Sequence, residues 1–191
     1  MNKIILASQS PRRKQLLEWA EVNFDIIVKE TDESYPLHLS VDDVPVHIAR
    51  NKALAVRKEL DDSAIIIAAD TVVVIGDEII GKPKDRGDAI QILSKLSGDK
   101  HSVITGVVIL HKGKEIAFAD ITNVWFHHLS QEQIGFYIDK YKPYDKAGAY
   151  AIQEWIGVVG IKKIEGDFYN VMGLPVSRVV KELSKFESGT L

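Results

Sequence analysis

The side chains best suited to phosphate chemistry lie near the amino terminus, in the motif Ser8-Gln9-Ser10-Pro11-Arg12-Arg13. Serine is a preferred N-cap and proline a preferred first helical residue, so the motif predicts a helix that begins at Pro11 after a short strand. Arg12 and Arg13 are unfavourable at the positive end of a helix unless an anion binds there. Backbone N–H groups, two hydroxyls and two guanidinium groups together suit an oligophosphate. From this motif alone, an ordinary capped helix with two solvated arginines is equally consistent.

Asp70 is a carboxylate inside a strongly apolar run. Residues 64–69 precede it and Val72–Ile75 follow, which predicts either one long central strand or a pair of buried strands. An ionised carboxylate there is costly unless it meets a cation, a metal or water in a cleft. Asp70 also falls at the end of the first run, and ligands of α/β sheets bind at the carboxyl ends of strands. We therefore predict that Asp70 is catalytic. The alternative is an aspartate that caps a turn, which the apolar flanks disfavour.

An acidic loop at residues 29–36 follows soon after the predicted phosphate site and contains Glu33. Carboxylates close to phosphates indicate a divalent metal, because Mg²⁺ is usually held by one or two carboxylates and by phosphate oxygens. Glu33 and Asp70 are thus candidate metal ligands. A solvated acidic loop is the commoner explanation of such a run taken alone.

Two lysines are candidate phosphate contacts. Lys52 lies beside the apolar stripe of a predicted helix, where an exposed lysine packing its stem on the surface is the ordinary interpretation. Lys82 lies in the turn Gly81-Lys82-Pro83. Residues 76–82 match the spacing of a P-loop, but proline stands where that motif needs Ser or Thr for Mg²⁺, so a P-loop is rejected.

Gln153 ends a segment of small residues that begins at Ala147. Small residues let a backbone approach a ligand, and the amide of Gln153 offers both a donor and an acceptor to a nucleobase edge. A surface glutamine is the ordinary explanation.

Hydrophobic periodicity predicts alternating strands and helices around these residues. The predicted strands are a short one from Ile4, then residues 24–28, 64–75 as one or two strands, 102–110, 115–126 and 156–164. The predicted helices begin at Pro11 and then cover residues 42–60, 88–96, 130–141 and 175–186, with Val179, Val180 and Leu183 of the last facing inward.

The composition is that of an ordinary globular protein. The 191 residues fit one domain or one compact two-lobed unit, and 46% hydrophobic residues supply a full core. A net charge of -3 gives no basic surplus for nucleic acid, so we expect no nucleic-acid partner. The absence of cysteine excludes disulfides and thiolate catalysis. The first apolar run is too short for a signal peptide and no stretch approaches a membrane span, so we expect a cytoplasmic protein without a membrane partner.

Taken together, the motifs resemble the Maf family of nucleoside triphosphate pyrophosphatases. Each is weak alone, but their ordered set is specific and spans nearly the whole chain. The residues that carry the resemblance are Ser8–Arg13, Ala68–Val73, Gly81-Lys82-Pro83, Leu96-Ser97-Gly98 with His101, Thr105-Gly106, Gly148–Gln153 and Gly166–Pro175.

The resemblance implies a fold and a reaction. The fold would be α/β, with a mixed central sheet flanked by helices and two lobes around a cleft, similar to the inosine triphosphate pyrophosphatases. Residues 1–191 would form one domain without a separable linker. The reaction would be hydrolysis of a nucleoside triphosphate to the monophosphate and pyrophosphate with a divalent metal, Mg²⁺, Mn²⁺ or Co²⁺.

The resemblance also implies roles for individual residues. Asp70 would orient or deprotonate the attacking water, and Glu33 with Asp70 would bind the metal. The phosphate contacts would be Ser8, Arg12, Arg13, Lys52 and Lys82. Arg12, Thr71 and Gln153 are typical of the version that acts on dTTP and UTP, with modified pyrimidine triphosphates as further candidate substrates.

Two other functions and the oligomeric state stay open at this point. The family name comes from a septum-related phenotype, so a nucleotide-binding regulator of cell division is an alternative that would need the phosphate site but not Asp70. A nucleic-acid-binding module fits the arginines but not the net charge. A homodimer is one alternative that the sequence neither predicts nor excludes.

Overall fold

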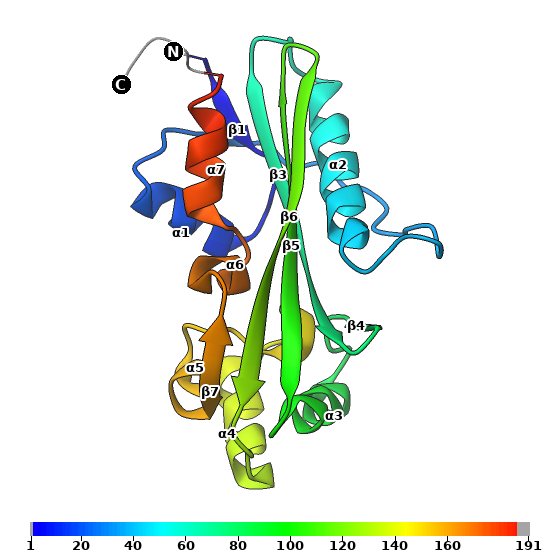
Figure 1. The fold of residues 1–191 in the computed structure, drawn as a ribbon, viewed down its shortest axis with the longest axis vertical. Coiled ribbons are helices and arrows are strands. Elements are labelled where there is room, and N and C mark those ends of the chain that lie inside the picture. Colours follow the sequence, from blue (N-terminus) through cyan, green and yellow to red (C-terminus); the bar gives the residue numbers. More distant parts are fainter. Residues whose placement is uncertain (1, 187–191) are drawn as a thin grey trace. The chain divides into compact units, whose positions relative to one another are not determined.

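A mixed seven-stranded sheet with helices packed against it organises the chain (Figure 1). The structure, a computed structural model, describes residues 2–186. Its elements are β1 (Ile4–Leu6), α1 (Pro11–Trp19), β2 (Asp25–Ile26), α2 (Asp43–Arg57), β3 (Ile65–Ile75), β4 (Glu78–Ile80), α3 (Arg86–Leu96), β5 (Lys100–His111), β6 (Lys114–Phe126), α4 (Gln131–Tyr141), the 3₁₀ helix η1 (Ala147–Ala149), α5 (Trp155–Gly160), β7 (Ile161–Glu165), α6 (Phe168–Met172) and α7 (Val176–Leu183). No helix within residues 2–186 is long and apolar enough to cross a membrane.

The strand order is β2-β1-β3-β5-β6-β7, with β4 paired to β3. β1 runs parallel to both β2 and β3, and its Ile5 lies opposite Asp25 on one side and Ile66 on the other. β4 is antiparallel to β3, and β7 is antiparallel to β6. The sheet is therefore mixed, and the predicted fold class, a mixed central sheet flanked by helices, is confirmed.

The chain divides into two compact units. Of the described residues, the first unit takes those up to Asp70, Thr105–Asp120 and those from Gly173 onward. The second unit takes Thr71–Ile104 and Ile121–Met172. The division falls inside β3, between Asp70 and Thr71.

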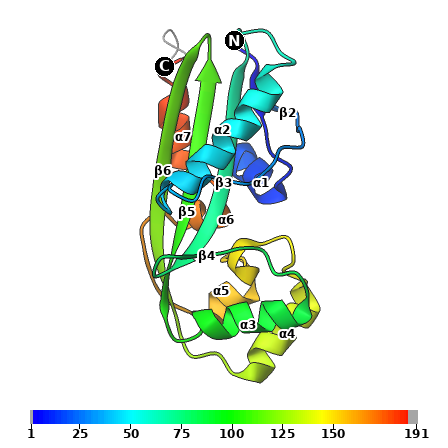
Figure 2. The same cartoon turned by 90° about the vertical axis from the view of Figure 1, so that its right-hand side faces the viewer.

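One hydrophobic cluster of the first unit lies between α2 and the strands, and Figure 2 shows α2 packed over them. Side chains that alternate along a strand share one face, and those of β3 that pack with α2 are Ile66 and Ala68. The same cluster includes Ile5, Ala7, Val108 and Leu110 from the sheet and Ala49, Ala53 and Val56 from α2. The next position on this face of β3 is residue 70, so a polar side chain continues an apolar row toward α2.

Two of the predicted helix starts, those of α1 and α4, are confirmed, whereas α3 begins at Arg86 with Asp85 as its N-cap, two residues before the predicted start. Ser10 is the N-cap of α1, Pro11 is its first residue, and the Ser10 hydroxyl accepts the Arg13 N–H at 3.4 Å. In α4, Ser130 and Gln133 form the predicted capping box.

The predicted strand at residues 156–164 is wrong in its first half, which forms α5 before β7 begins at Ile161. An apolar β-branched run suits either state, and tertiary packing decides. One helical turn buries Ile156 and Gly160 on the same side and leaves Val158 80% exposed. A Cβ on Gly157 would lie 1.7 Å from the Ile152 carbonyl oxygen, so this turn needs glycine for its close approach.

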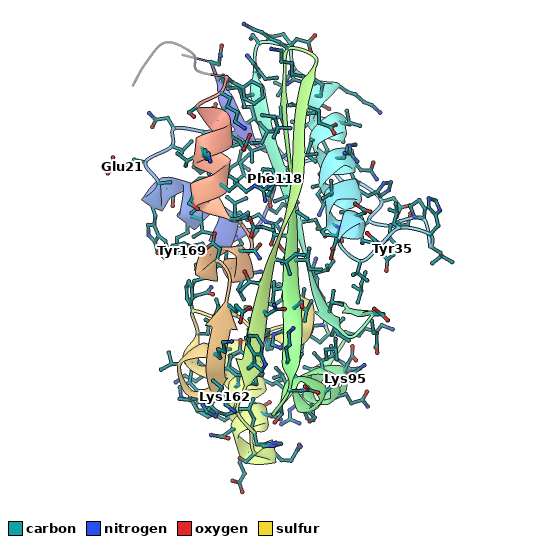
Figure 3. All side chains as sticks on the ribbon, in the orientation of Figure 1. Glu21, Tyr35, Lys95, Phe118, Lys162 and Tyr169 are labelled. Atoms are coloured by element: carbon teal, nitrogen blue, oxygen red, sulfur yellow. The ribbon has the colours of Figure 1, made fainter. Side chains whose placement is uncertain are left out.

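The closing helix is shorter than predicted, and one of its inward residues was assigned wrongly. Val179 and Leu183 of α7, four residues apart, lie on one side of the helix and are buried. Val180 is turned about 100° from Val179 around the helix and is 39% exposed. Arg178 holds α7 to β6 by donating to the Ala119 carbonyl at 3.1 Å. The Cζ of its guanidinium also lies 4.0 Å from the centroid of the Phe118 ring, and Figure 3 labels Phe118.

We expect Gly106→Ala to destabilise the first unit by at least about 2 kcal/mol, because overpacking against backbone cannot be relieved by a rotamer change. An added Cβ would lie 2.2 Å from the Val46 nitrogen and 2.3 Å from the Pro45 carbonyl carbon, at the start of α2. Gly135→Ala in α4 is the matched control, since its Cβ would meet only Arg86 at 3.7 Å. For Gly135→Ala, helix propensity predicts an increase of about 0.5–1 kcal/mol in the free energy of unfolding. Urea unfolding measures both, and equal stabilities would contradict the packing account.

Candidate active site

Asp70 lies in the middle of β3. The strand is continuous over 11 residues, so Asp70 neither ends a strand nor caps a turn, and both of those sequence-based placements are wrong. β1 pairs with Ile65–Ile67 and β4 with Val73–Ile75, so neither of these neighbours reaches residue 70. The Asp70 side chain is 14% exposed and is directed toward α2 by the alternation of the strand.

Lys52 of α2 compensates the charge of Asp70. Its Nζ lies 2.7 Å from Asp70 Oδ1 and 2.7 Å from Glu33 Oε1. The Lys52 side chain is only 17% exposed, so the ordinary interpretation of a surface lysine does not apply. Three of the predicted site residues, from a loop, a helix and a strand, therefore meet at one ammonium group.

A tight turn presents Glu33 to this cluster. Asp32 accepts the Ser34 N–H at 2.8 Å, an Asx turn centred on Glu33, and the Ser34 hydroxyl donates to the same carboxylate at 2.6 Å. These hydrogen bonds lower the pKa of Asp32. Tyr35, labelled in Figure 3, marks this loop.

The donor set of the cluster fits a hard divalent cation. Glu33 and Asp70 direct one carboxylate oxygen each toward the same positive charge, and carboxylate oxygens are the ligands that Mg²⁺ prefers. Within residues 2–186, no group of three or more His, Cys, Asp or Glu side chains could hold a metal ion. Within the described part of the chain, this cluster therefore offers two carboxylates to a metal ion.

Arg13 is a buried clamp rather than a solvated cation. Its Nε donates to the Gly173 carbonyl at 2.7 Å and its Nη1 donates to the Ser8 hydroxyl at 3.1 Å. Burial lowers the pKa of Arg13, while the carboxylates of Asp70 and Glu33 act against that shift. The serine–arginine motif and the carboxylate cluster are thus close enough to interact electrostatically within the first unit.

The Ser8 hydroxyl is arranged as a donor. It accepts the Ser10 N–H at 3.2 Å as well as the Arg13 Nη1–H. Because a hydroxyl has two acceptor positions and one donor, these two bonds use its lone pairs and leave the proton for a third group. Ser10 by contrast serves the helix cap, and Arg12 is partly exposed.

The remaining predicted site residues, Thr71, Lys82 and Gln153, belong to the second unit. A Cβ on Gly148 would lie 2.8 Å from Val73, so the segment before Gln153 covers the face of β3 that carries residues 71 and 73. The Gly148 N–H donates to the Gly81 carbonyl at 3.1 Å, which ties this segment to the turn of Lys82. Lys82 and Gln153 are both exposed. Their assembly with Asp70 stays a prediction.

A histidine–tyrosine pair secures the same segment. His101 of β5 is 2% exposed, and its Nε2 lies 2.7 Å from the Tyr150 hydroxyl. Burial lowers the pKa of His101 to about 4 and raises that of Tyr150. The His101 ring also packs edge-on against Phe126. A neutral imidazole thus anchors Tyr150 three residues before Gln153.

Sequence reasoning missed two groups that hold these residues. The Gly173 carbonyl that accepts from Arg13 had a weak signal, because Gly173 adopts a φ of 118° just before Leu-Pro. Tyr137 of α4 contacts the Gln153 segment but had no signal in the sequence, because a tyrosine on an apolar helix face is typical of an ordinary core residue.

The fold and the site together define an α/β protein with a carboxylate–lysine–carboxylate cluster beside a serine–arginine clamp. Its fold is similar to that of a HAM1 protein from Coxiella burnetii, with a TM-score of 0.52 at 13% identity over 97% of this chain and all of the other. The model of the Maf-like protein family matches residues 3–186. The chain belongs to the Maf family.

Several relatives in this family are closely similar. A dTTP/UTP pyrophosphatase of Cytophaga hutchinsonii is 54% identical over 182 residues, covering 95% of this chain and 83% of that protein. A dTTP/UTP pyrophosphatase of Parabacteroides distasonis is 47% identical over 185 residues, covering 96% of each.

We expect Arg13→Lys to lower the free energy of unfolding by about 3 kcal/mol, because one ammonium cannot reproduce a fork that donates to both Gly173 and Ser8. Arg12→Lys is the matched control, and a change within about 0.5 kcal/mol is expected for this partly exposed neighbour. Chemical unfolding compares the two variants. Equal losses would show that Arg13 is no more structural than Arg12.

The stability of the protein should fall as the pH drops from about 6.5 to about 4. His101 stays neutral in the folded state down to a pKa of about 4, whereas the unfolded chain binds that proton near pH 6.5. The unfolded state therefore binds more protons in this window, and up to about 3 kcal/mol is lost across it. His101→Gln should show a flatter dependence in urea unfolding at pH 7, 5.5 and 4. Parallel curves would contradict a neutral buried His101.

Proposed function

We propose that this protein hydrolyses dTTP and UTP to the nucleoside monophosphates and pyrophosphate. The observation that carries the proposal is Asp70, a carboxylate in the middle of an apolar strand that is held by Lys52 beside Glu33. Family membership and the names of relatives 47% and 54% identical support the same reaction. The triphosphates are intracellular metabolites, so we further propose a cytoplasmic location.

In the proposed reaction a water molecule attacks the α-phosphorus. A bond forms from the water oxygen to that phosphorus, and the bond to the oxygen bridging to the β-phosphorus breaks, so pyrophosphate leaves with the electron pair. Asp70 would orient this water or accept its proton, as a positioned carboxylate can. Lys52, which is paired with Asp70, would hold the carboxylate in place.

Hydrogen-bond donors and positive charges of the serine–arginine motif would stabilise the negative charge of the phosphates. Ser8 has a hydroxyl proton to donate, because its lone pairs are occupied by Ser10 and Arg13. Arg12, partly exposed on the first turn of α1, and Lys82 in its turn would supply the further positive charge. Arg13 would act mainly by fixing Ser8. Such preorganised donors stabilise charge that moves during the reaction.

Glu33 and Asp70 would be the carboxylates that hold the divalent metal, Mg²⁺, Mn²⁺ or Co²⁺. A bound divalent ion neutralises phosphate charge and aligns phosphate oxygens. Two protein carboxylates with ligands from the substrate is a common arrangement for Mg²⁺. Lys52 contacts both carboxylates and so limits their mutual repulsion without the ion.

Selection of the base would rest on Arg12, Thr71 and Gln153. Uracil and thymine present carbonyl, N–H and carbonyl along one edge, which an amide can match by accepting the N–H and donating to a carbonyl. Cytosine reverses the donor and acceptor at two of these positions. Because the two preferred bases differ only at C5, tolerance there would also admit pyrimidines modified at that carbon.

Incubation with a panel of nucleoside triphosphates tests the proposal. We expect pyrophosphate and monophosphate from dTTP and UTP with Mg²⁺ or Mn²⁺, and loss of turnover when EDTA removes the metal. Asp70→Asn should lower kcat by about 10²–10⁴-fold, the range of general acid–base catalysis, with Asp77→Asn in the exposed β3–β4 turn as control.

Two results would overturn the proposed hydrolysis and the role of Asp70 in it. Nucleotide binding without product from any triphosphate would favour the regulator of cell division over the enzyme. An Asp70→Asn protein with normal turnover and normal metal dependence would remove Asp70 from both of its proposed roles.

A further inference from the structure

Tyr137 of α4 bridges both sides of Gln153. The Tyr137 hydroxyl donates to Glu154 Oε2 and accepts the Ala151 N–H at 3.1 Å. Its side chain is fully buried and stacks on the ring of Tyr141 at a centroid distance of 5.0 Å. One rigid phenol therefore ties the residue after Gln153 and the residue two before it to the same helix.

The carboxylate that Tyr137 contacts is itself fixed. Glu154 Oε1 lies 3.7 Å from the Nζ of Lys146, while Oε2 accepts from Tyr137. Lys146 is buried and also pairs with Asp145 at 2.7 Å. The two oxygens of Glu154 thus have different partners, Tyr137 of α4 and Lys146 of the loop before η1, and these contacts restrain the Glu154 side chain.

The segment before Gln153 is anchored separately. Tyr150 is held by His101, and Gly148 is held by the Gly81 carbonyl and packs against Val73. These contacts fix residues 148–150 to β3 and β5, so the Tyr137 bonds act on the part of the segment nearest Gln153. The exposed Gln153 side chain then projects from a backbone fixed on both sides.

We propose that Tyr137 is the positioning residue that sets base selection through Gln153. The inference rests on the proposed function, because it assumes that Gln153 reads the base. Hydrogen bonds to a base edge are lost when the amide shifts by about 1 Å. Loss of the restraint on the Gln153 backbone should therefore reduce discrimination between bases more than it reduces turnover. Without the hydroxyl, the buried Ala151 N–H also loses its acceptor, which favours local opening.

Tyr137→Phe tests this with the ring and its stacking kept. We expect kcat/KM for dTTP and UTP to fall about tenfold through KM, with dCTP hydrolysis nearly unchanged, as for one lost hydrogen bond. The matched control is Tyr141→Phe, which removes a hydroxyl from the stacked neighbour on the same helix and should leave the dTTP/dCTP ratio as in the wild type. Glu154→Gln keeps an oxygen acceptor for Tyr137 and should retain most of that ratio.

A double-mutant cycle separates positioning from a general structural effect. If Tyr137 acts through Gln153, then Tyr137→Phe should change the dTTP/dCTP ratio no further in a Gln153→Ala background. Additive effects, or a wild-type ratio in Tyr137→Phe, would overturn the inference.

Hydrogen exchange keeps the test independent of turnover. The amides of residues 151–154 should exchange faster in Tyr137→Phe than in Tyr141→Phe, and equal exchange would refute the anchoring itself. A wild-type protein that cleaves no triphosphate would refute the proposed function and the role in selection with it. Unchanged selectivity in an active Tyr137→Phe protein would refute the inference alone.

Discussion

An ionised carboxylate in the middle of a buried strand needs a partner, and the ion pair between Asp70 and Lys52 is the contact on which the first unit depends. It requires α2 to lie along the face of β3 that Ile66 and Ala68 share with Asp70. The close approach of Gly106 to the start of α2 permits that packing. With Lys52 in this position, Glu33 can pair with its ammonium group, which holds the Glu33 loop against α2. Helix, strand and loop are thus positioned by one ammonium group.

The serine–arginine motif shows how neighbouring residues of one type come to do different work. Arg13 follows Arg12 by one position, which turns it about 100° around the helix and into the protein. There it joins α1 to the Gly173 carbonyl, 160 positions away in the chain, and fixes the Ser8 hydroxyl as a donor. Arg12 is partly exposed and is the arginine of this pair that we propose as a phosphate contact. The cost of burying Arg13 is offset locally by Asp70 and Glu33, so the clamp and the carboxylate cluster support each other.

The sequence was informative wherever a signal is local. Ser10-Pro11 specifies a helix start by its own chemistry, and a single carboxylate in an apolar run drew attention to Asp70, which the structure pairs with Lys52. Features decided by distant contacts were missed or misplaced. The helix at residues 155–160 depends on the Ile152 carbonyl that Gly157 must approach, and the role of Tyr137 depends on where residues 151 and 154 fold. One long strand through Asp70 was one of the two predicted alternatives, but its ion pair with Lys52 was not foreseen, because no pattern along α2 reveals that partner.

Asp70 and Thr71 are adjacent in β3, and alternation places their side chains on opposite faces of the strand. Asp70 faces α2, whereas Thr71 shares with Val73 the face that Gly148 covers. The groups assigned to cleavage and those assigned to base selection are therefore built on separate cores, one around Lys52 and one around the segment held by Tyr137 and His101. If Gln153 selects the base as we propose, substitutions behind it would alter which base is accepted while the Asp70 cluster stays intact. This separation offers a physical route by which one fold could change its substrate range without rebuilding its chemistry.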